Sequence, residues 1–208
     1  MSRHDVRDDQ LPSGAGTGPR DVPIVPAASI LVLRGEPFRV LLMRRSDRST
    51  FVPGNWVFPG GTVEPADRGA DEEATFRACA VRELREEAGI DLRAEDLVLT
   101  SRWVTPEGVP KRFDTAFYLA AVGDAVEPRA DAQEAVELRW FDPGEAVAEN
   151  AAGRLAMVFP TIRNLMDLRG QESIPALLAA RRAAAIPVTR PVIREVNGKK
   201  TVTLPDEA

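Results

Sequence analysis

The sequence predicts an α+β fold in which helices pack on a β-sheet as an α/β/α sandwich. Strand-like apolar runs occur along the chain, and helical runs lie between and after them without a regular alternation. The chain has 208 residues, of which 44% are hydrophobic and 28% charged. This composition is enough to bury one sizeable core and is not that of a disordered protein.

The first part of the chain predicts a tail followed by a pair of strands. Residues 1–23 are rich in Gly, Pro, Ser and Asp, which is typical of a flexible N-terminal tail. Apolar runs at 28–33 and 38–43 predict two strands joined by a turn at 35–37. The segment 49–61 follows as a loop with a short strand, closed by two glycines.

A helix is predicted over 71–88. Val81, Leu84 and Ala88 recur at i, i+3 and i+7 and form an apolar stripe, and Gly89 is a plausible C-terminal stop.

The rest of the chain predicts three strands, three helices and a final hairpin. Asp142, Pro143 and Glu145 have the order of N-cap, N1 and N3 of one helix, and Asn197-Gly198 between alternating residues predicts the hairpin turn. The strands are expected at 97–104, 115–122 and 135–141, and the other two helices at 161–168 and 174–184.

Composition excludes several classes of function. The formal net charge of −5 leaves no basic footprint for nucleic acid, and no stretch has the length of a membrane span. The one cysteine, Cys79, allows no internal disulfide, and the N-terminus has no apolar run of a secretory signal. We therefore expect a cytoplasmic protein without nucleic-acid or membrane partners.

Residue counting also narrows the chemistry. The single histidine, His4, lies in the predicted tail, so a buried Ser-His-Asp or Cys-His device and a Cys/His zinc site are excluded. If the chain is an enzyme, its carboxylates must carry the reaction.

The helix at 71–88 carries a cluster of such carboxylates. On a helix, Glu83 neighbours both Glu86 and Glu87, so the three share one face. Oxygen ligands favour Mg²⁺ or Mn²⁺, and Mg²⁺ in proteins usually also binds substrate phosphates. The competing interpretation is a solvated acidic face on which Arg82 and Arg85 are the ion-pair partners.

The residues around this cluster resemble the Nudix family. Arg82-Glu83-Leu84, Glu86-Glu87 and Gly89-Ile90 match the end of the Nudix box, and Phe58-Pro59-Gly60-Gly61 matches its entrance. The spacing from Gly61 to Arg82 is longer than in the consensus, and Ala74 stands at the position of its first glutamate. Glu72 or Glu73 is expected to substitute for that glutamate.

A second set of residues resembles the coenzyme A diphosphatase branch of this family. The match covers Leu41-Leu42-Met43-Arg44-Arg45-Ser46 and Gly54 before the box, the long insert at 62–75, and the segments 103–107 and 112–115. Thr50 and Met43 depart from the motif of that branch. The resemblance implies a Nudix-type α/β/α sandwich with a mixed β-sheet, a Nudix domain at 24–150, and C-terminal helices and a hairpin at 151–208 packed on it.

The resemblance also implies roles for individual residues. Glu83, Glu86 and Glu87 would hold Mg²⁺ or Mn²⁺, with the Gly60 backbone and Glu134 as further ligands. Glu134 is also the candidate general base, with Glu137 as its competitor. Arg82 would orient the helix by pairing with an upstream carboxylate. The expected substrate-binding residues are Arg45, Gly61, Lys111 and Arg112.

Three functions remain open at this point. The first is hydrolysis of the diphosphate linkage of coenzyme A or acyl-CoA. The second is hydrolysis of ADP-ribose or a related sugar nucleotide, because Pro106 follows Ile90 by 16 residues, a spacing similar to that in ADP-ribose-cleaving Nudix enzymes. The third is a non-catalytic Nudix-fold module that senses a nucleotide. In each case the partner is a small nucleotide-like molecule, and a homodimer is an open alternative for the assembly.

Overall fold

The computed structural model describes residues 21–131, 134–196 and 199–204. Most of the predicted tail lies outside these residues. The strands are β1 (Ile24–Arg34), β2 (Arg39–Arg45), β3 (Trp56–Val57), β4 (Gly60–Thr62), β5 (Val98–Val104), β6 (Arg112–Ala121), β7 (Ala135–Phe141), β8 (Val188–Thr189), β9 (Val192–Val196) and β10 (Lys199–Thr203). The helices are α1 (Glu72–Ala88), α2 (Pro143–Ala151), α3 (Phe159–Leu168) and α4 (Ile174–Ala183), with short 3-10 helices at Pro65–Asp67 and Ala94–Asp96.

One mixed sheet forms the centre of the described structure. Its main path runs β3-β2-β1-β6-β5-β8, while β4 pairs with β1 and β7 pairs with β2. β1 and β6 are parallel along nearly their whole length, whereas β1 pairs antiparallel with β2 and β4. β9 and β10 form a separate antiparallel hairpin. The prediction of an α+β fold with a mixed sheet is therefore confirmed.

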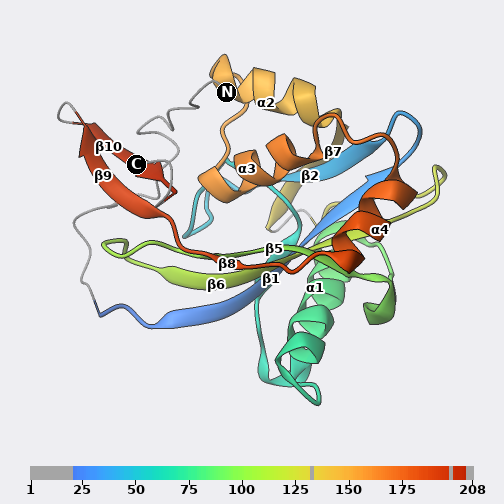
Figure 1. Cartoon of the computed structure of the whole chain (residues 1–208), viewed down its shortest axis with the longest axis horizontal. Helices are drawn as coiled ribbons and strands as arrows, with labels where there is room; N and C mark the ends of the chain where they lie inside the picture. The colour runs from blue at the N-terminus through green and yellow to red at the C-terminus, as the bar shows by residue number, and fades with distance from the viewer. Residues whose placement is uncertain (1–20, 132–133, 197–198, 205–208) are drawn as a thin grey trace.

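The central strand β1 is buried on both faces of the sheet. Because successive side chains of a strand point to opposite faces, Ile30 and Val32 join the core beneath α1, while Leu31 and Leu33 join the core beneath α2 and α3. Figure 1 shows α1 on one side of the sheet and α2 and α3 on the other. The order of the layers is the expected α/β/α sandwich.

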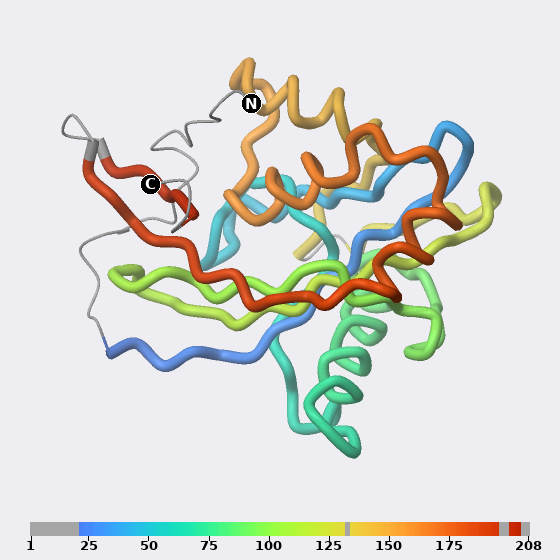
Figure 2. The backbone as a smooth tube through the Cα atoms, viewed as in Figure 1, coloured from blue at the N-terminus to red at the C-terminus, as the bar shows by residue number. Residues whose placement is uncertain are grey.

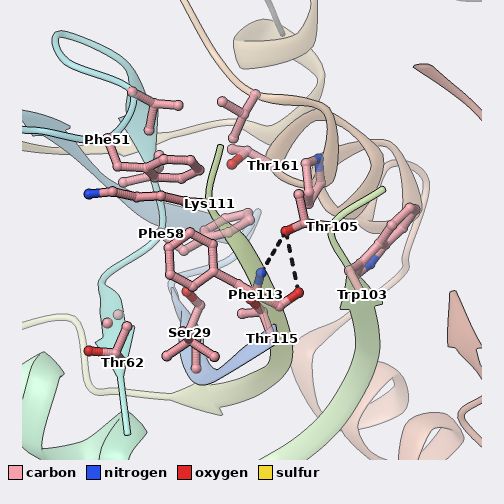
Figure 3. A pocket seen from close by; sticks show the side chains of 18 of the residues that line it. Ser29, Phe51, Phe58, Thr62, Trp103, Thr105, Lys111, Phe113, Thr115 and Thr161 are labelled. Carbon is pink, nitrogen blue, oxygen red and sulfur yellow. Dashed lines mark hydrogen bonds between the residues drawn. The ribbon is translucent and has the colours of Figure 1, made fainter. Parts of the chain in front are cut away.

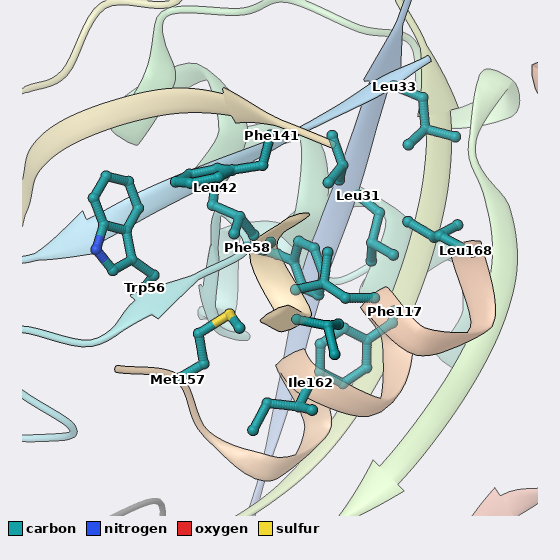
Figure 4. Packing of buried hydrophobic residues seen from close by; sticks show 14 of the residues in the cluster. Leu31, Leu33, Leu42, Trp56, Phe58, Phe117, Phe141, Met157, Ile162 and Leu168 are labelled. Carbon is teal, nitrogen blue, oxygen red and sulfur yellow. The ribbon is translucent and has the colours of Figure 1, made fainter. Parts of the chain in front are cut away.

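The larger core lies on the α3 side of the sheet. Figure 4 shows Met157, Ile162 and Leu168 packed toward Leu31 and Phe117 of the sheet. Val202 of β10 belongs to the same core, so residues after position 151 share apolar packing with the sheet. The tube in Figure 2 follows the chain from α3 through α4 along the sheet to the hairpin. No helix among the described residues is long and apolar enough to cross a membrane.

Most elements begin and end close to their predicted positions. α1 starts after Asp71, whose side chain accepts a hydrogen bond from Ala74 N at 2.7 Å, and it ends at Gly89 with φ 63°. The apolar stripe is partly different from the prediction. Val81 is only half-buried, while Phe76, Cys79 and Ala80 are buried. The predicted turn at Asn197-Gly198 lies outside the described residues, although β9 and β10 flank it.

Candidate active site

A cleft of about 620 Å³ opens on the α3 side of the sheet. Strands β1, β4 and β6 contribute to its wall. Further lining comes from the last turns of α1, which carry Glu83, Glu86 and Glu87, from the first turn of α3 and from the β9–β10 hairpin. Figure 3 shows Ser29, Phe58, Thr115 and Lys111 among the side chains that surround it. The carboxylate helix and the C-terminal part of the chain therefore meet at one site.

The chemical character of the lining differs along the cleft. α1 and β4 contribute mainly charged and backbone groups, whereas the residues from β5, β6, α3 and the hairpin are mainly apolar. The charged lining residues are Arg45, Glu64, Arg82, Glu83, Glu86, Glu87, Lys111, Asp131 and Glu134, of which Lys111 lies beside Phe51, away from Thr62 of β4 (Figure 3). The apolar group includes Val104, Val109, Phe113, Phe117, Val158, Phe159, Ile193 and Val202.

The two glycines of β4 bring the sheet close to α1. A Cβ on Gly60 would collide with Ala28 O and Ser29, and a Cβ on Gly61 would collide with the Glu83 carboxylate. Glycine at both positions therefore permits the close approach of backbone and carboxylates. In this arrangement Gly60 N donates a hydrogen bond of 2.8 Å to Glu87 Oε2.

Glu87 is buried, which does not fit the competing interpretation of a solvated acidic face. Its side chain is only 3% exposed, and Oε1 has no hydrogen-bond partner among the described residues. Burial raises the pKa of Glu87 to about 8, against the opposing hydrogen bond from Gly60. A buried carboxylate oxygen that lacks a donor is a position where a cation would be stabilising.

Glu83 and Glu86 both contact Arg82. The NH1 atom of Arg82 lies 2.9 Å from Glu83 Oε1 and 2.9 Å from Glu86 Oε2. Burial raises the pKa of Glu83, and the Arg82 charge opposes this. Glu86 is more open to solvent, with a side chain 53% exposed.

The upstream carboxylate that pairs with Arg82 is Asp67, and neither Glu72 nor Glu73, the candidates for the first consensus glutamate, pairs with Arg82. Asp67 Oδ1 and Oδ2 each lie 2.9 Å from the guanidinium, at Nε and NH2. Glu72 instead pairs with Arg102 at 2.8 Å, and Glu73 with Arg77 at 2.7 Å. Consensus spacing does not identify this partner, because Asp67 lies in a 3-10 turn of the inserted segment, before α1 begins.

Glu134 and Arg45 lie together at the cleft. Arg45 NH2 is 3.8 Å from Glu134 Oε2, and Arg45 Nε donates to Phe51 O at 3.2 Å. Asp131 accepts hydrogen bonds from the backbone of Glu134 and of Ala135, which fixes the start of β7. Glu137, the competing candidate, is exposed and is not among the cleft-lining residues.

The two other predicted cations have different surroundings. Lys111 lines the cleft and donates to Thr50 Oγ1 at 3.2 Å. Arg112 does not line the cleft, because its Nε donates to Thr105 O at 3.1 Å across the β5–β6 turn. The geometry thus gives Arg112 a structural contact instead of the predicted substrate contact.

The oxygen donors at this end of the cleft suit a hard divalent cation. The described residues contain no group of three acidic, cysteine or histidine side chains already arranged around one ion position. Arg82 instead holds Glu83 and Glu86 through one nitrogen. The unpartnered Oε1 of Glu87 nevertheless fits such an ion, because Mg²⁺ and Mn²⁺ prefer carboxylate oxygen.

Sequence reasoning missed the apolar wall of the cleft as well as Asp67. Val158, Phe159, Pro160 and Thr161 line the cleft where α3 begins, and Ile193 and Val202 line it from the hairpin. The sequence indicated a helix and a hairpin here, but no local pattern tells which side of the sheet they cover.

Comparison with known proteins agrees with this arrangement. The model of the NUDIX domain family matches residues 23–162. "Putative nudix hydrolase 7" of Caenorhabditis elegans is 32% identical over 179 residues, which cover 68% of this chain and 59% of that protein. The human "Acyl-coenzyme A diphosphatase NUDT19" is 26% identical, with 53% of this chain and 55% of that protein covered. The chain thus spans a little over half the length of each.

A solved structure has the same fold. The NUDIX hydrolase from Alicyclobacillus acidocaldarius superposes with a TM-score of 0.69 at 24% identity, and the match covers 79% of this chain and 100% of that one. The family match includes the carboxylates of α1, the two glycines of β4 and the strands that hold them. On this ground the chain belongs to the Nudix family.

Proposed function

We propose that this protein is a diphosphatase that requires Mg²⁺ or Mn²⁺ and cleaves the diphosphate linkage of coenzyme A or acyl-CoA. The single observation that carries the proposal is the cleft, which is lined both by the carboxylates of α1 and by a mainly apolar wall from β5, β6, α3 and the hairpin. A substrate for such a cleft has a diphosphate joined to a long arm with little charge. The phosphopantetheine part of coenzyme A has this chemistry.

The names of relatives add support for this substrate class. Proteins named acyl-coenzyme A diphosphatase from human, Gallus gallus and Xenopus laevis match the chain at 22–26% identity. Proteins named NAD-capped RNA hydrolase also match, at 28–29% identity. Both names describe the cleavage of a nucleotide derivative.

In the proposed reaction, water attacks one phosphorus and the bridging P–O bond breaks. The products are a 3',5'-phosphorylated adenosine and a phosphopantetheine derivative. A divalent ion held there would supply positive charge that stabilises the charge developing on the diphosphate during the reaction. Glu83, Glu86 and Glu87 would hold the ion, and the backbone of Gly60 would be a further ligand. Glu134 would accept the proton of the attacking water.

The basic residues of the cleft would position the substrate. Arg45 lies at the carboxylate end, so its charge would face the diphosphate. Lys111 has no carboxylate partner among the described residues and contacts only the Thr50 hydroxyl, so its charge is available to a substrate phosphate.

The second candidate function is hydrolysis of ADP-ribose. Pro106, whose spacing suggested this reaction, does line the cleft. The NUDIX domain of Shewanella oneidensis NrtR, described in complex with ADP ribose, shares the fold with a TM-score of 0.54 at 14% identity. The apolar wall argues against this function, because beyond the diphosphate ADP-ribose carries a polar ribose, whereas its adenosine part is shared with coenzyme A.

One substrate panel tests the proposal. Purified protein with Mg²⁺ is given coenzyme A, a medium-chain acyl-CoA, dephospho-CoA and ADP-ribose, and products are identified by mass spectrometry. We expect the highest kcat/KM for coenzyme A or acyl-CoA. A preference for ADP-ribose would replace the first function by the second, and binding without turnover of any substrate would favour a non-catalytic sensing module.

A further inference from the structure

One guanidinium connects two groups of carboxylates. Arg82 holds Asp67 through Nε and NH2 at 2.9 Å each, and through NH1 it contacts Glu83 and Glu86 at 2.9 Å each. The first contact joins α1 to the inserted segment. The second engages two of the residues that we propose as metal ligands, so Arg82 and a divalent cation would compete for the same oxygens.

Asp67 is built to hold Arg82 firmly. Its side chain is 4% exposed, and Oδ2 also accepts a hydrogen bond of 2.8 Å from Glu64 N, which fixes the 3-10 turn. Both of its oxygens face the guanidinium, and such bidentate pairs are the stronger and better oriented kind. Arg82 itself is only 14% exposed, so water can do little to neutralise its charge if Asp67 is lost.

We propose that Asp67 is a positioning residue that controls divalent-cation affinity by keeping Arg82 from competing for Glu83 and Glu86. The inference rests on the proposed function, because it takes these glutamates as the ligands. Without the Asp67 charge, the Arg82 guanidinium pairs more strongly with Glu83 and Glu86. A cation can then bind these two carboxylates only by displacing the guanidinium. The insert between Gly61 and α1 then has a function, since it supplies the carboxylate that consensus spacing does not.

This role can be distinguished from that of an ordinary structural ion pair by how cation affinity changes when each partner is removed. Cutting a structural pair at either end harms the site in the same direction. If Arg82 is a competitor restrained by Asp67, loss of Asp67 weakens cation binding, whereas loss of Arg82 leaves it unchanged or tighter.

The test is the binding of Mn²⁺ to the full chain, measured by titration calorimetry without substrate. Asp67→Asn should weaken Mn²⁺ binding by about tenfold, the size of one charge-assisted hydrogen bond. Arg82→Gln should not weaken it. In the double variant, Asp67→Asn should have no further effect, because its effect acts through Arg82.

Asp114→Asn is the matched control. It cuts a pair of the same geometry, in which Arg102 Nε and NH2 lie 2.8 Å from the two oxygens of Asp114, and neither residue lines the cleft. It should change the melting temperature about as much as Asp67→Asn and leave Mn²⁺ affinity unchanged.

Each other outcome has a distinct meaning. If Asp67→Asn still lowers the Mn²⁺ affinity tenfold in the Arg82→Gln background, the inference is overturned. Asp67 would then act on the ion directly, through the electrostatic attraction of its own charge. Equal weakening by Asp67→Asn and Arg82→Gln would reduce the pair to a structural one. If Asp67→Asn does not fold, Arg82→Gln alone decides, since weaker binding there contradicts a competitor. Wild-type protein that binds no Mn²⁺ would refute the proposed function itself.

Discussion

Replacing Glu87 by glutamine should stabilise the metal-free protein near neutral pH. Glu87 is 3% exposed, one of its oxygens has no partner among the described residues, and burial raises its pKa from 4.5 to about 8. The folded state must therefore keep a proton that the unfolded chain releases. Glutamine has nearly the same shape and carries no charge, so it avoids this cost.

The size of the effect follows from the pKa difference. Stability from the folded state's tighter proton binding is fully present below pH 4.5 and is lost as pH rises through the folded pKa of about 8. At pH 7 the loss amounts to at most about 4 kcal/mol, at about 1.4 kcal/mol per pH unit above the unfolded pKa. For a chain of this length, that corresponds to a shift in Tm of up to roughly 10 °C.

The assay is thermal unfolding in excess chelator between pH 5 and pH 9. Wild type should lose stability relative to Glu87→Gln as pH rises, and the two curves should run parallel above about pH 8. Glu86→Gln is the matched control, because the Glu86 side chain is 53% exposed and should give little change. A Glu87→Gln protein less stable than wild type at pH 7.5 would refute the reasoning from burial.

Other predictions concern activity. Protein in excess EDTA should be inactive and should recover with Mg²⁺ or Mn²⁺, and full activity in the chelator would contradict the carboxylate mechanism. Glu86→Gln should lower kcat by at least about 100-fold, because metal charge stabilisation supplies several kcal/mol, and its unfolding curve checks that the fold is intact. Arg45→Met and Lys111→Met should each be assayed with coenzyme A and dephospho-CoA. The substitution of the residue that contacts the 3'-phosphate should lower the ratio of kcat/KM for coenzyme A to that for dephospho-CoA by about tenfold. If neither substitution changes this ratio, the 3'-phosphate binds elsewhere.

Much of the fold was predictable because it depends on local patterns. β7 spans the predicted residues, and Asp71 and Gly89 mark the ends of α1 as expected. Such boundaries are set by capping hydrogen bonds and by alternation along a strand, which a single sequence displays. The two-residue strand β8 was not predicted, since it is too short for a periodicity to show.

The site was predictable in its residue types but not in its environment. Helical spacing put Glu83, Glu86 and Glu87 on one face, yet Glu87 is buried because β4 packs against α1 at Gly60 and Gly61. Burial of this kind depends on the approach of a distant strand, which no helical projection includes.

The partner of Arg82 was missed for a related reason. The ion pair joins residues that are 15 positions apart, across an insert of irregular structure. Only the three-dimensional path of the 3-10 turn brings Asp67 to the guanidinium. The turn begins at Glu64 and Pro65, and no local sequence pattern connects it to Arg82.

The most direct test of the central claim is hydrolysis of an acyl-CoA in ¹⁸O-labelled water, with mass spectrometry of the products. We predict a 3',5'-phosphorylated adenosine and an acylated phosphopantetheine, with one ¹⁸O atom in the phosphate of one product. The reaction should require Mg²⁺ or Mn²⁺ and be nearly abolished in Glu87→Gln. Release of free fatty acid by thioester cleavage, or an intact diphosphate after prolonged incubation with the metal, would contradict the account.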